Sequence, residues 1–176
     1  RDPGSAGLLK EIGVKRPIQV GADMAFLIPP PHESGEMSFQ VGDMKTIGIA
    51  PRPFGKETGN IIKLFGDFSR LLFQANLMPV LIEMDAEDDR NLIHEISKTQ
   101  GGKVPDIKKL QTPMNVQTRM ARMESVVAMR LHAGILAATV GVPPFMVSYD
   151  PKVTAFAKLL EMGSAPAIQG LTAQRL

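Results

Sequence analysis

Short apolar runs recur along the chain from residue 44 onward, and each is followed by a segment with helical character. The runs do not alternate between apolar and polar residues, which is typical of strands that helices cover on both faces. They lie at residues 46–50, 77–84, 125–129 and 142–147. Their spacing of roughly 20 to 30 residues suits strand–helix–strand units with parallel strands. The pattern predicts an α/β fold with a doubly wound, mostly parallel, Rossmann-like sheet.

The segments between these runs carry helix signals of their own. Residues 61–75 place apolar side chains on one helical face, and residues 88–100 form a polar helix that Gly101 is placed to stop. Residues 131–140 are apolar almost all round, so we expect this helix to be covered on several sides. Asp150 is a good N-cap for a helix that begins at the following proline.

The first part of the chain lacks this alternation of apolar runs and helical segments. It opens with an apolar helical face that ends at Gly13, and residues 17–28 look extended. We therefore expect two parts, an interdomain helix and linker at 1–43 and a Rossmann-like domain at 44–176. The tail from residue 164 shows no clear pattern.

Composition excludes several classes of function. The net charge is only +2 and the chain has no Trp and one Tyr, so neither a basic patch nor a base-stacking platform indicates a nucleic-acid partner. The chain has no Cys, which removes disulfides and thiolate chemistry and fits a reducing compartment. No metal-ligand spacing occurs, and no apolar run reaches the roughly 18 to 20 residues of a membrane span. Nucleotide-binding glycine motifs are also absent.

Charged and titratable residues follow the predicted strands at their carboxyl ends. In a doubly wound sheet these ends meet at one edge, where ligands bind. The candidates are Arg52, Asp85, Arg130 with His132, and residues 148–152. Because cationic groups dominate, the sequence predicts a site for an anionic ligand.

Arg130 and His132 are the strongest candidates. A guanidinium at a strand end can hold a carboxylate or phosphate through two parallel hydrogen bonds, and the alternative is an ion pair with a neighbouring acidic residue. His132 falls in the first turn of a buried helix, where the helix dipole favours anions. The same field lowers the pKa of a histidine, so His132 could act as an acid only when a bound anionic substrate favours its charged form. The alternative is a neutral, buried histidine bonded to backbone.

The other candidates are more ambiguous. Arg52 lies between two prolines, which stiffens its backbone, and the alternative is a solvated loop arginine. Lys152 faces either the site or solvent. Asp85 more often caps the next helix in such a position than takes part in chemistry.

Several motifs together resemble the C-terminal half of the polysaccharide pyruvyl transferases, the CsaB type in particular. The specific pair is Arg130-Leu131-His132-Ala133 and Ser148-Tyr149-Asp150-Pro151-Lys152. Weaker pieces are Arg1-Asp2 with Ser5, Ala22-Asp23-Met24-Ala25-Phe26, Gly48-Ile49-Ala50-Pro51-Arg52-Pro53 and Gly141-Val142-Pro143. The chain departs from the family pattern at Met24, Gly134 and the double Pro143-Pro144, and the last two are packing positions.

The resemblance implies a GT-B-like enzyme of two Rossmann-like domains, with this chain as the second domain and inactive alone. Such an enzyme transfers pyruvate from phosphoenolpyruvate to a sugar as a ketal and releases phosphate, with no cofactor. The implied acceptor is a lipid-linked or cell-wall sugar that contains N-acetylmannosamine, and the pyruvylated polymer anchors surface-layer proteins. The implied location is the cytoplasm, at the inner face of the membrane through the acceptor.

The resemblance also implies residue roles. Arg52, Arg130 and Leu131 would bind phosphoenolpyruvate, and His132 would donate the proton to its methylene carbon. Lys152, the last residue of the Ser-Tyr-Asp-Pro-Lys motif, is a further candidate for substrate binding.

Two other functions stay open from the residues. A nucleotide-sugar glycosyltransferase or epimerase of the same fold would bind a uridine nucleotide and release no phosphate from phosphoenolpyruvate. A non-catalytic module that binds an anionic glycan would hold Arg130 and His132 in internal pairs.

Overall fold

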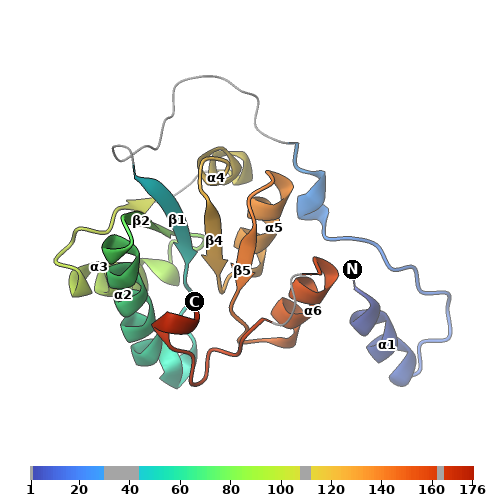
Figure 1. Cartoon of the computed structure of the whole chain (residues 1–176). Coiled ribbons are helices and arrows are strands. Elements are labelled where there is room, and N and C mark those ends of the chain that lie inside the picture. Colours follow the sequence, from blue (N-terminus) through green and yellow to red (C-terminus); the bar gives the residue numbers. More distant parts are fainter. Residues whose placement is uncertain (1, 30–43, 108–111, 162–164) are drawn as a thin grey trace.

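One parallel sheet of five strands forms the centre of the protein (Figure 1). The structure, a computed structural model, describes residues 2–29, 44–107, 112–161 and 165–176. The strands are β1 (Lys45–Ala50), β2 (Leu77–Ile82), β3 (Asp106–Ile107), β4 (Ser125–Ala128) and β5 (Pro144–Met146), in the order β3-β2-β1-β4-β5. All neighbouring pairs are parallel, which confirms the predicted doubly wound α/β fold.

Helices cover both faces of the sheet. The α-helices are α1 (Pro3–Glu11), α2 (Thr58–Gln74), α3 (Asp89–Thr99), α4 (Pro113–Met120), α5 (Leu131–Thr139) and α6 (Pro151–Leu159). Short 3-10 turns form at η1 (Met24–Leu27), η2 (Gly55–Glu57) and η3 (Ala173–Arg175). Helices α2 and α3 share a core with one face, and α4, α5 and α6 share a core with the other. No helix within the described ranges combines the length and apolarity that a membrane span requires.

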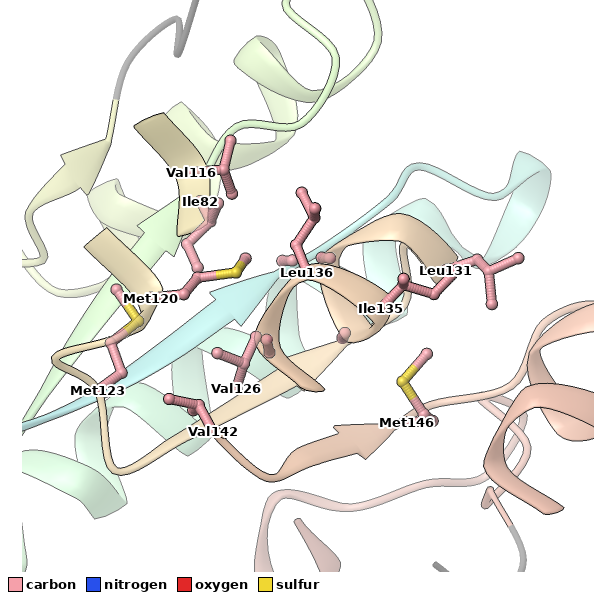
Figure 2. Close-up of a cluster of buried hydrophobic side chains, with 14 of the residues drawn as sticks. Ile82, Val116, Met120, Met123, Val126, Leu131, Ile135, Leu136, Val142 and Met146 are labelled. Atoms are coloured by element: carbon pink, nitrogen blue, oxygen red, sulfur yellow. The ribbon is translucent and has the colours of Figure 1, made fainter. Parts of the chain in front are cut away.

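The strands contribute side chains to both cores in alternation. In β4, Val126 and Ala128 belong to the core with α5, whereas Val127 belongs to the core with α2. Figure 2 shows the core on the side of α5, where Leu131, Ile135 and other α5 side chains meet residues from β4, β5 and α4. Because partners surround α5 on several sides, the helix is apolar almost all round, as its sequence predicts.

The N-terminal helix forms where expected, but its apolar side chains stay largely exposed. None of its residues is buried, and Leu8 and Ile12 are 59% and 70% exposed. Gly13 ends the helix with a φ of +93°, a conformation that glycine adopts without strain. Figure 1 shows α1 at the periphery, beyond α6.

The expectation of an extended segment at 17–28 is wrong in part, because η1 lies within it. The side chain of Asp23 accepts a hydrogen bond from the backbone N–H of Ala25 and so initiates the turn. Phe26 then packs against Phe156 of α6, with ring centroids 6.4 Å apart. The rest of the expected linker, residues 30–43, lies outside the described residues.

The C-terminal tail has more order than its sequence suggests. Ser148 forms a parallel bridge with Ala167, and η3 packs on α2. Ile168 and Ala173 are the buried anchors. The apolar residues of the tail follow neither a helical nor a strand period, so sequence patterns miss its order.

The close packing of β1 generates a testable prediction. A Cβ added at Gly48 would lie 2.7 Å from Met123 Sδ and 2.9 Å from Ile82 Cδ1, inside the core. We expect Gly48→Ala to lower the free energy of unfolding by roughly 1–3 kcal/mol through overpacking, measured by urea denaturation. Gly59→Ala is the matched control, because nothing lies within 4 Å of that position in α2. Equal effects of the two substitutions would contradict this account of the core.

Candidate anion-binding site

The central strands β1 and β4 lie side by side, and the chain leaves them in opposite directions. From β1 it continues through α2 to β2, and from β4 through α5 to β5. A crevice forms at the carboxyl ends of strands where the order reverses in this way. Arg52 follows β1 and Arg130 follows β4, so both side chains belong to this crevice.

A cavity of about 310 Å³ occupies this edge of the sheet. It is lined by Arg52, Met84, Asp85, Arg130, Leu131, His132, Tyr149 and Lys152. The structure thus brings together all five residues that the sequence and the resemblance select for the site. Four of the lining side chains are basic or imidazole groups, and one is a carboxylate.

Tyr149 connects two of the cationic groups. Nη1 of Arg52 donates a hydrogen bond of 2.8 Å to the Tyr149 hydroxyl, and the guanidinium lies 5.1 Å from the ring centroid. Nζ of Lys152 lies 5.6 Å from the same centroid. Phe54 packs against the ring as well, with centroids 5.5 Å apart. Arg52 is therefore a positioned residue of the site and not a solvated loop arginine.

Arg130 is paired with three aspartates. Its Nε donates to Asp89 Oδ1 at 3.2 Å, and its Nη2 contacts Asp89, Asp88 at 3.3 Å and Asp85 at 3.9 Å. The side chain is only 13% exposed. The alternative of an internal ion pair is thus realised for Arg130, although the residue also lines the cavity.

Asp89 is the main partner of Arg130 and has no exposed surface. Its Oδ2 accepts hydrogen bonds from the backbone N–H groups of Met84 and Asp85, at 3.2 and 3.0 Å. Burial raises the pKa of Asp89, against the opposing effects of the hydrogen bond and charge of Arg130. Burial alone would lower the pKa of Arg130, but its hydrogen bonds with Asp89 and Asp88 and the nearby carboxylate charges raise it. The pair keeps a guanidinium charged while it joins the ends of β2 and β4 to the start of α3.

His132 is not the buried histidine of the alternative interpretation. Its side chain is 59% exposed, and its Nε2 lies 3.7 Å from Asp23 Oδ1. Asp23 comes from the turn that starts η1, so the Ala-Asp-Met-Ala-Phe motif lies beside the Arg-Leu-His motif. The side chain of Arg130, the N-cap residue of α5, makes no capping hydrogen bond to a described residue.

Asp85 does not cap the next helix as its sequence position suggests, because the N-cap of α3 is Asp88; its carboxylate bonds within the turn before α3, and it lines the cavity. Its Oδ1 accepts from the backbone N–H groups of Glu87 and Asp88, at 3.1 and 3.4 Å. Asp150 is the predicted N-cap of α6, since its side chain accepts from the backbone N–H of Lys152 at 2.9 Å.

The sequence analysis missed Asp89 altogether, and it gave no role to Asp23 or Tyr149, although both lie in motifs that it named. Tyr149 lies within a motif singled out above, but nothing in the sequence relates it to Arg52. Asp89 starts a helix that is polar by composition, and its burial depends on Arg130, 41 positions away in the chain. Only the three-dimensional arrangement reveals these contacts.

Solved structures share the fold at low identity. The E. coli heptosyltransferase WaaC, solved with ADP-2-deoxy-2-fluoro heptose, superposes with a TM-score of 0.53 and 14% identity over 95% of this chain. The chain spans 50% of the length of that heptosyltransferase. A molybdenum cofactor carrier protein from Chlamydomonas reinhardtii gives a TM-score of 0.48 at 13% identity, over 72% of this chain and 92% of its own. The likeness to WaaC concerns the fold alone.

Sequence comparison gives a family. No curated protein matches the chain. The family model described as polysaccharide pyruvyl transferase matches residues 1–151, which include the Arg-Leu-His motif and the Ser-Tyr-Asp-Pro-Lys motif except for its last residue, Lys152. The chain therefore belongs to the polysaccharide pyruvyl transferase family.

Proposed function

We propose that the protein transfers pyruvate from phosphoenolpyruvate to a sugar as a ketal and releases phosphate. The observation that carries the proposal is the position of Arg52 and Lys152, which both lie over the ring of Tyr149 in the cavity that His132 lines. Two cations in one small cavity suit a ligand with two anionic ends. Phosphoenolpyruvate has a carboxylate at one end and a phosphate at the other.

Arg130 can bind the donor with only part of its guanidinium, because aspartates occupy two of its three nitrogens. Its Nε and Nη2 are held by Asp89 and Asp88. Its Nη1 makes no hydrogen bond to another described residue, and Arg130 lines the cavity, so this nitrogen can bind an anion there. A guanidinium fixed by its other nitrogens loses little conformational freedom when a ligand binds.

His132 and Leu131 complete the donor site in this proposal. Protonation of the methylene carbon makes the neighbouring carbon electrophilic, and a sugar hydroxyl then attacks it. His132 is exposed beside the cavity and can donate that proton once the anionic donor is bound. Leu131, which is 7% exposed, offers an apolar wall for the methylene group.

The acceptor and the cellular setting extend the same proposal. We expect a lipid-linked or cell-wall sugar, with N-acetylmannosamine as the modified residue and surface-layer anchoring as the purpose, as in the CsaB type. Such an acceptor would bring the enzyme to the inner face of the membrane, in the cytoplasm. The chain spans half of the heptosyltransferase length, so we expect activity to require both halves of a GT-B-like enzyme.

The non-catalytic alternative retains one supporting observation. It requires internal pairs for Arg130 and His132; Arg130 has them, and His132 has a longer contact with the Asp23 carboxylate. His132 is more than half exposed, and its Asp23 neighbour lies beyond hydrogen-bonding distance, at 3.7 Å. The exposed imidazole favours an enzyme over a passive glycan-binding module.

Phosphate release tests the reaction directly. The full-length protein should release inorganic phosphate from phosphoenolpyruvate only when a lipid-linked disaccharide acceptor is present, and residues 1–176 alone should release none. A coupled phosphate assay measures both. If the protein instead bound a uridine nucleotide and left phosphoenolpyruvate intact, the glycosyltransferase alternative would be correct.

Substitutions should separate donor binding from proton transfer. Lys152→Met removes a charge-assisted contact worth roughly 1.5–3 kcal/mol, so the KM for phosphoenolpyruvate should rise about 10- to 100-fold. His132→Gln should lower kcat roughly 10²- to 10⁴-fold with little change in donor affinity. Steady-state kinetics of the full-length enzyme measure both effects.

The control for the lysine is Lys158→Met, because Lys158 lies on the same helix, α6, outside this cavity. It should behave like the wild type. An unchanged turnover in His132→Gln would remove the acid role of that residue.

A further inference from the structure

We propose that Asp85 is the base that takes the proton from the attacking sugar hydroxyl. This inference rests on the proposed pyruvyl transfer and adds the residue that handles the acceptor. A ketal forms from two hydroxyl groups, and both must lose their protons. The departing phosphate can accept one of them, and the other needs an acceptor in the cavity.

Asp85 is the one carboxylate among the described residues that line the cavity. Asp89 is fully buried behind Arg130, and Asp88, though 52% exposed, is not part of the lining. Asp150 caps α6, and Asp23 lines a smaller neighbouring cavity, which shares Leu131 and Lys152 with this one. Position therefore distinguishes Asp85 from the acidic residues around it.

The Asp85 carboxylate is held by one oxygen and open at the other. Its Oδ1 accepts the backbone N–H groups of Glu87 and Asp88, which fixes the side chain. Its Oδ2 lies 3.9 Å from Arg130 Nη2, too far for a hydrogen bond, and the side chain is 46% exposed. Oδ2 can thus receive a hydroxyl proton while Oδ1 keeps the group in place.

The proton balance of the reaction agrees with this role. His132 gives one proton to the methylene carbon, which becomes the methyl group of the ketal. The first hydroxyl forms a C–O bond to the adjacent carbon and gives its proton to Asp85. The C–O bond to phosphate then breaks, the second hydroxyl bonds to the same carbon, and its proton leaves on the hydrogen phosphate. The proton on Asp85 returns to His132 through solvent, so no oxidant or further reactant is needed.

The charges in the cavity suit both substrates in this arrangement. Arg52 and Lys152 attract the donor anion at Tyr149, while the carboxylate of Asp85 follows a different strand, β2. Arg130 lies close to Asp85 and offsets the repulsion between this carboxylate and the donor. A neutral diol is not repelled by a carboxylate and can donate a hydrogen bond to it.

The test uses Asp85→Asn in the full-length enzyme, with phosphate release and calorimetric binding of phosphoenolpyruvate as readouts. Asparagine keeps the acceptor oxygen for the turn but cannot take a proton. We expect kcat to fall at least about 100-fold, with donor affinity within about 3-fold of the wild type. Asp85→Glu, which retains a carboxylate, should recover part of the lost turnover.

Two controls separate this role from others. Glu87→Gln removes the same charge from an exposed neighbour and should leave turnover unchanged. Asp88→Asn removes a contact with Arg130 that is shorter than the one made by Asp85. A larger loss of turnover in Asp88→Asn than in Asp85→Asn would show that Asp85 acts only through Arg130. That result would overturn the proposal. Wild-type turnover in Asp85→Asn would overturn it too, with pyruvyl transfer intact. Absence of phosphate release in the wild type would instead overturn the proposed function and this inference together.

Discussion

The pairing of β1 with β4 is the constraint on which the site depends. In this register Ala50 lies opposite Ala128, and the backbone N–H of Met129 still bonds to the carbonyl of Ala50 at 3.0 Å. Arg52 and Arg130 follow these paired alanines at equal distances along their strands. The two arginines therefore reach the same level at the carboxyl edge. A shift of register by one residue would turn the side chains of one strand toward the opposite face and separate the pair.

The buried pair of Arg130 and Asp89 fixes the remaining parts of this edge. Taking two charges out of water costs free energy that their attraction offsets only when the other hydrogen-bonding groups are also satisfied. Asp89 meets this condition through the backbone N–H groups of Met84 and Asp85. The same contacts tie the end of β2 to the end of β4, and so they also place Asp85 at the cavity. An arginine with a structural role thus positions a carboxylate that can have a chemical one.

Sequence patterns predict the sheet because apolar strands and amphipathic helices have local signatures. They also predict that Arg52, Arg130 and His132 converge, since the carboxyl ends of parallel strands share one edge. They leave open whether Arg130 pairs with an acidic residue and do not identify Asp89 as its partner, and they do not predict that Tyr149 joins Arg52 to Lys152. Those contacts depend on side chains far apart in sequence, such as Arg52 and Tyr149, 97 positions apart. The turn at Met24–Leu27 was missed for a different reason, because one aspartate cap decided the local conformation.

A crystal structure with phosphoenolpyruvate bound would test the central claim most directly, namely that this edge of the sheet is the donor site. The account predicts that the carboxylate and the phosphate of the ligand lie between Arg52 and Lys152, with the methylene carbon within reach of His132. The result that would contradict it is a donor bound elsewhere, for example in the larger cavity of about 810 Å³ between the start of α1 and α6, with the cavity at Arg130 empty.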